Sequence, residues 1–201
     1  MTAALVALIS APVSALLGLL GGVYLTRKRD ANQARAAILS IVLEMSLLED
    51  VFAQAIEHSH RLRDEISREA WEEHSGILVN WLPWHLVTAL HVHQQQFATV
   101  KEIYRRLTTS LTSGPALDDM YATLWCFVYW SRFLREQIQA AVARLDHSIM
   151  PRRPNGASPS KQEEEKLARL LERLNSEALS YVRSKGIEPK TYVPIGVTTI
   201  H

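Results

Sequence analysis

Residues 34–66 read ARAAILSIVLEMSLLEDVFAQAIEHSHRLRDEI, and apolar side chains recur through this stretch at steps that alternate between four and three residues. This spacing puts them on one face of a helix, in the heptad pattern of coiled coils and helical bundles. The predicted seam comprises Ala34, Ile38, Ile41, Met45, Leu48, Phe52, Ala55, Ser59, Leu62 and Ile66. Val42, Val51 and Ile56 broaden the seam, which favours a helix packed inside a globular bundle over a two-stranded coiled coil.

Upstream of this stretch, residues 2–26 contain no Asp, Glu, Lys or Arg. Because about 20 mostly apolar residues suffice to cross a bilayer as a helix, we predict a transmembrane anchor with its basic flank over residues 1–29. No positive region precedes the apolar run, so we expect a retained anchor and not a cleaved signal peptide. Arg27, Lys28 and Arg29 follow the run directly. The positive-inside rule then places the N-terminus outside and the rest of the chain in the cytoplasm, with the lipid bilayer as a partner.

Within the predicted span, small residues recur every four positions, at Ser10, Ser14, Gly18 and Gly22. A ridge of this kind allows two transmembrane helices to approach closely and gain van der Waals contact. Such ridges are also common by chance in spans rich in glycine and alanine. The pattern is therefore compatible with a homo-oligomer and equally with a monomeric anchor.

Two further long helices are predicted in the middle of the chain. Pro83 suits the first turn of one of them, whose apolar face runs from Leu86 to Leu111. Ser113, Gly114 and Pro115 interrupt the pattern, and a similar face follows over residues 117–145. A short helix is expected after Ser67, ending near Gly76. Short connections favour antiparallel neighbours, so we predict an all-α antiparallel bundle over residues 30–149 that continues directly from the transmembrane helix.

The C-terminal part is predicted to be a hinged amphipathic helix. A linker rich in proline spans residues 150–160, a helix with a capping box at Ser160 and Glu163 spans 161–185, and an extended or disordered tail spans 186–201. The helix has one narrow apolar stripe, formed by Leu167, Leu171, Leu174, Ala178 and Tyr181. This stripe needs a partner surface, which could be its own bundle, its copy in a second subunit, or a separate protein.

His93 is the polar residue that stands out on a predicted seam, because Leu90 and Phe97 flank it on the same helix face. A buried histidine needs a hydrogen-bond partner, and Ser59 or Ser131 on neighbouring seams could supply it. We interpret His93 as a structural core residue. The alternative is a pH-responsive switch, because burial disfavours the imidazolium.

The sequence contains no recognisable catalytic constellation. Glu57 and His60 have the spacing of one half of a di-iron site, but no second pair or further inward carboxylates accompany them. We therefore expect no catalytic residues, cofactor or metal. A net charge of +1, from 22 basic and 21 acidic residues, also argues against a nucleic-acid partner.

Together these patterns indicate a single-pass cell-membrane protein and not an enzyme. The first hypothesis for its function is a membrane-tethered module that binds an unknown protein partner. The alternative is a homo-oligomeric membrane effector that assembles through its transmembrane helix.

Overall fold

The computed structural model describes residues 2–58, 68–109, 115–145 and 158–190, with side chains described over 20–57, 68–107, 117–143 and 158–190. Over these residues the chain forms helices and no strand, so the predicted all-α fold is confirmed. The elements are α1 (Thr2–His58), α2 (Glu69–Trp81), α3 (Trp84–Thr109), α4 (Pro115–Leu145) and α5 (Lys161–Ser184).

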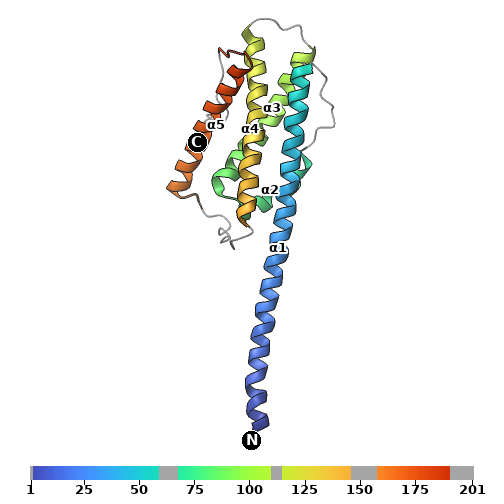
Figure 1. Cartoon of the computed structure of the whole chain (residues 1–201), viewed down its shortest axis with the longest axis vertical. Helices are drawn as coiled ribbons and strands as arrows, with labels where there is room; N and C mark the ends of the chain where they lie inside the picture. The colour runs from blue at the N-terminus through green and yellow to red at the C-terminus, as the bar shows by residue number, and fades with distance from the viewer. Residues whose placement is uncertain (1, 59–67, 110–114, 146–157, 191–201) are drawn as a thin grey trace.

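The five helices form an up-and-down bundle with α4 at its centre (Figure 1). α4 runs antiparallel to α1, α3 and α5 and contacts all three. α2 packs mainly along α1. The neighbours of α4 are therefore antiparallel to it, as the sequence predicts.

The core is built from the predicted heptad faces of α1, α3 and α4. Phe52 of α1 lies at its centre and makes edge-to-face ring contacts with Phe97 and Tyr104 of α3 and Phe127 of α4. Tyr104 also donates a hydrogen bond of 3.1 Å to the backbone oxygen of Ala55, which satisfies its buried hydroxyl. The fully buried large side chains are Trp130, Phe52, Phe127, Ile38, Ile41, Met45, Leu48, Leu78, Leu90, Leu124, Leu134 and Ile138. The seam positions Ser59, Leu62, Ile66 and Leu111 lie outside the described residues.

α2 differs from the prediction at its C-terminal end. The predicted end near Gly76 is wrong, because the helix continues to Trp81. Glycine weakens a helix interior by about 1 kcal/mol, a cost that burial of Leu78 beyond it outweighs. At the other end, the N-cap residue Arg68 makes no side-chain cap. Glu44 of α1 takes that role and accepts the Ala70 N–H at 2.9 Å, while burial raises the pKa of its carboxyl.

α1 is one unbroken helix that extends far beyond the bundle on its N-terminal side (Figure 1). Residues 21–29 are exposed, and Leu20, Val23, Tyr24 and Leu25 are large apolar side chains in this exposed part. Over the described part of the chain, no helix combines the length and apolar character needed to cross a membrane. The predicted ridge residues Ser10, Ser14 and Gly18 lie outside the residues with described side chains.

Candidate functional site

His93 lies inside the bundle between α3 and α4, with 1% of its surface exposed. Its ring stacks on Phe127 at a centroid distance of 4.3 Å. The Ser131 hydroxyl donates to the Phe127 backbone oxygen at 3.0 Å, so its oxygen accepts from His93 Nε2 at 2.8 Å. This network puts the proton on Nε2 and leaves Nδ1 deprotonated, with no hydrogen-bond partner among the described residues.

The environment of His93 therefore favours the neutral ring. A second proton would have to sit on Nδ1, where no acceptor is available among the described residues. Burial lowers the pKa of His93 to about 3, against an opposing effect of the Phe127 backbone. Of the two partners considered from the sequence, Ser131 is the one in contact, and Ser59 lies outside the described residues.

The apolar stripe of α5 packs against its own bundle. Leu167, Leu174 and Ala178 are buried, whereas Leu171 and Tyr181 are partly buried against the core. The capping box is present, with the Ser160 side chain accepting from the Glu163 N–H and the Glu163 carboxylate accepting from the Ser160 N–H. Of the three partner surfaces considered for this stripe, the structure places it on the chain's own bundle.

The surface that receives α5 is the aromatic face of α4. Trp125 and Tyr129 both contact the ring of Tyr181, at centroid distances of 5.8 and 5.5 Å. The Tyr129 hydroxyl donates to Glu177 at 2.6 Å, and burial together with this bond raises the pKa of Tyr129 to about 12. At the end of α5, Lys185 binds Glu57 of α1 at 3.2 Å and lies over the Trp125 ring.

An ion cluster around the buried Glu49 joins α1 to α4, and it was missed in the sequence. Glu49 has 5% of its surface exposed, and its two oxygens accept from Arg132 Nε at 2.7 Å and Arg135 Nη2 at 2.9 Å. The hydrogen bond from Arg132 to Glu49 raises the pKa of the Arg132 guanidinium. In the sequence Glu49 directly follows the seam residue Leu48, so the pattern predicts a solvent-exposed charge. The three-residue spacing of Arg132 and Arg135 is the one sequence feature that indicates a shared acceptor. Both oxygens of Glu49 are therefore paired, and the two ion pairs hold α1 and α4 in register.

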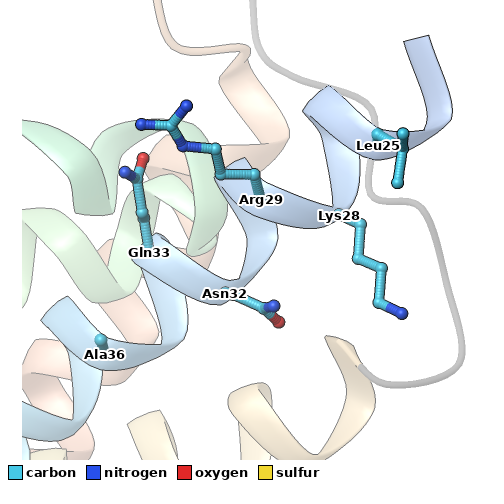
Figure 2. Close-up of a pocket in the computed structure, with 6 residues that line it drawn as sticks. All are labelled: Leu25, Lys28, Arg29, Asn32, Gln33 and Ala36. Atoms are coloured by element: carbon cyan, nitrogen blue, oxygen red, sulfur yellow. The ribbon is translucent and has the colours of Figure 1, made fainter. Parts of the chain in front are cut away.

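The basic residues at the predicted membrane boundary are exposed on α1. Arg27, Lys28 and Arg29 all face solvent, in the part of α1 that extends beyond the bundle. A shallow hollow of about 470 Å³ lies along this part, lined by Leu25, Lys28, Arg29, Asn32, Gln33 and Ala36. Figure 2 shows Arg29 and Gln33 projecting on one side of α1, and Lys28 on the other. All the lining residues belong to one helix, so the hollow has no opposing described wall and does not form an enclosed ligand site.

Large apolar side chains are exposed mainly on α1. Gly22, in the same exposed part of α1, has free space beside its Cα, because a Cβ added there meets no atom within 4 Å. The exposed large apolar residues are Leu20, Val23, Tyr24, Leu25, Leu39, Leu43, Leu47 and, on α2, Val79. Leu39, Leu43 and Leu47 lie within the bundle portion of α1 but on its outer side, outside every site predicted from the sequence.

Within the described residues, no group of three histidine, cysteine, aspartate or glutamate side chains could hold a metal ion. Glu57 is described and pairs with Lys185, whereas His60 lies outside the described residues. Cys126 is buried in the core. No family model, curated protein or solved structure matches this chain.

Proposed function

We propose that this chain is a single-pass membrane protein whose helical bundle acts as an interaction module on the cytoplasmic side. The observation that carries the proposal is α1, which runs as one helix from the uncharged residues 2–26, past a basic cluster, into the bundle core. Large apolar side chains exposed on a helix outside any core, such as Leu20 and Leu25, favour lipid over water.

The basic cluster sets the expected orientation. Arg27, Lys28 and Arg29 are exposed and therefore available to lipid phosphates. Because they lie between the apolar segment and the bundle, the positive-inside rule favours a bundle in the cytoplasm and places the N-terminal side of the apolar segment outside. A reporter fused after His201 should be active only on the cytoplasmic side. Changing the three basic residues to glutamine should weaken that preference, and an external reporter in the unchanged chain would contradict it.

Membrane insertion is tested with charges placed in the apolar segment. The full-length chain should float with membranes and resist extraction with alkali and high salt. Leu16→Arg combined with Leu20→Arg should release it, because each central charge costs roughly 2.5–3.5 kcal/mol on insertion. Thr99→Arg, at an exposed position of α3, is the matched control and should leave flotation unchanged. Recovery of the unchanged chain in the soluble fraction would contradict the proposal.

The interaction surface is proposed to lie on α1. The stripe of α5 is occupied by its own bundle, so it offers little surface to an unknown protein partner. The outer side of α1 instead exposes Leu39, Leu43 and Leu47. Exposed apolar residues in one line are typical of interaction surfaces.

A homo-oligomeric effector is the second candidate, favoured by the open position of Gly22 at the end of the small-residue ridge. Purification from membranes distinguishes the two candidates. An interaction module should bring down an unlike protein in stoichiometric yield, or a copy of itself in a contact that is lost when Leu43 of the bundle is changed to serine. An effector assembled by the ridge should lose self-association in the Gly22→Leu variant, because the larger side chain prevents close approach of two helices. A Cβ at this position meets no other atom of the chain within 4 Å, so the fold of a single copy should not change.

A further inference from the structure

The bundle portion of α1 has two apolar faces. One is the seam through Ile38, Ile41 and Met45, which is buried in the core. The other faces outward, and every exposed residue between positions 36 and 48 belongs to it. We call it the outer face, and it comprises Ala36, Leu39, Leu43 and Leu47. Leu43 has 68% of its surface exposed, more than any other large apolar residue described.

We propose that the outer face is the contact surface of a parallel dimer formed by two membrane-anchored copies of this chain. The proposal rests on the membrane anchoring proposed above, and it names the partner as a second copy. Its four residues are spaced by three, four and four positions, so they form one stripe along α1.

The distribution of charge along α1 favours a second copy. In a parallel pair related by a two-fold axis along α1, each residue meets its own counterpart, so an exposed charge there would meet a like charge. Exposed charges lie below the outer face, at Lys28 and Arg29, and above it, at Asp50 and Glu57, but none lies within it. The nearby carboxylate of Glu44 is turned towards α2, where it accepts the Ala70 N–H.

The heptad register connects the outer face to the anchor. Gly22, Arg29, Ala36 and Leu43 follow one another at intervals of seven residues, so they lie on one line of a left-handed helix pair. Gly22 is open to close approach at the lower end of that line. Arg29 and Asp50, which continues the line seven residues beyond Leu43, are its charged positions, and both lie outside the outer face. The place of Arg29 next to the apolar segment puts its long side chain at the level of lipid phosphates.

The size of the outer face explains why the anchor is needed. A standard interface uses roughly 20–30 residues a side, so four residues are too few for a stable dimer in solution. Because α1 is continuous, Leu43 lies about 20 Å along the helix axis from Arg29 in every copy. Anchoring in one membrane would therefore give all copies the same orientation and place Leu43 at the same distance from the bilayer. Confinement to one membrane also raises the effective concentration of the second copy.

Cysteine cross-linking of the full-length chain in phosphatidylcholine and phosphatidylglycerol vesicles tests the proposal. Leu43→Cys places identical thiols face to face, and mild oxidation should give a disulfide-linked species of twice 22.7 kDa. Thr99→Cys, at an exposed position of α3, is the matched control and should yield roughly tenfold less dimer. The unchanged chain gives the background, since Cys126 is buried. Adding Leu39→Ser and Leu47→Ser to the Leu43→Cys variant should reduce its dimer by a similar factor.

Three results would overturn the proposal. A chain that floats with the vesicles but cross-links no better at Leu43→Cys than at Thr99→Cys would exclude the self-contact and leave the anchor proposal standing. A chain that does not float would exclude both. Cross-linking of Leu43→Cys in cell membranes to a species other than twice the chain mass would identify an unlike partner. Leu39→Cys repeats the test at a second position, and circular dichroism confirms that each variant retains its helices.

Discussion

Replacement of His93 by leucine should remove a large part of the acid sensitivity of the bundle. The ring stacks on Phe127 and donates from Nε2 to Ser131, so a leucine of similar bulk keeps most of the packing. Ser131 retains its bond to the Phe127 backbone oxygen after the change. The substitution therefore removes a titratable group and leaves no new donor without an acceptor.

The magnitude follows from the difference between the folded and unfolded pKa of His93. The folded value is about 3 and the ordinary value is 6.5, so the unfolded chain binds the proton first as the pH falls. The contribution of the neutral His93 ring to the free energy of unfolding is therefore fully present above pH 6.5, decreases as the pH drops below that value, and is completely lost below pH 3. By linkage the full loss is about 5 kcal/mol, and about 2 kcal/mol of it is reached at about pH 5.

Chemical denaturation of the full-length chain in detergent micelles, followed by tryptophan fluorescence, measures this effect. Between about pH 7.5 and 5 the unchanged chain should lose about 2 kcal/mol more unfolding free energy than His93→Leu. His91→Leu, at an exposed position of the same helix, is the matched control and should keep the steep profile. Equal pH profiles for the unchanged chain and His93→Leu would refute the reasoning, because they would require a histidine that is solvated or whose charge is compensated.

Three further substitutions test the helix contacts. Glu49→Gln should cost about 1–2 kcal/mol of unfolding free energy, because it removes the buried carboxylate charge and one of the two oxygens that accept from Arg132 and Arg135, and a loss below about 0.5 kcal/mol would show that the cluster is not formed. Leu174→Asp puts a charge at a position with 0% exposure and should release α5, seen as faster deuterium exchange in α5 but not in α4; unchanged exchange would mean that α5 is not docked. Ser160→Ala removes the capping box and should cost about 1 kcal/mol, whereas Ser176→Ala, at an exposed position inside α5, should cost little.

The sequence predicts the parts of the fold that depend on local periodicity. The seam from Ala34 to Phe52 is buried as its heptad spacing predicts, and His93 lies in the core because its own seam continues on both sides. These features follow from one helix at a time, since a period of about 3.6 residues determines which side chains share a face. The capping box at Ser160 is local in the same sense.

The features that sequence reasoning left open or missed depend on pairs of helices. The α5 stripe had three candidate surfaces, and the choice is determined by Trp125 and Tyr129, whose rings exceed what the α4 seam needs and receive Tyr181. Glu49 reads as solvated until α4 brings its arginines to it. The end of α2 was misplaced because burial of Leu78, a tertiary effect, outweighs the local cost of a glycine.

The continuity of α1 gives these tertiary contacts a mechanical consequence. Residues 23–58 contain neither glycine nor proline, so the helix has no built-in kink between the exposed N-terminal part and the core. The ion pairs of Glu49 join α1 to α4, and the apolar seam of α1 is packed in the core. The bundle therefore cannot rotate about α1 without breaking these contacts. A rotation or displacement of α1, in the membrane location proposed above, would consequently carry the whole bundle with it. Leu43 is on the opposite side of the same rigid helix, so a contact made there constrains the orientation of the bundle as well as its distance from a neighbour.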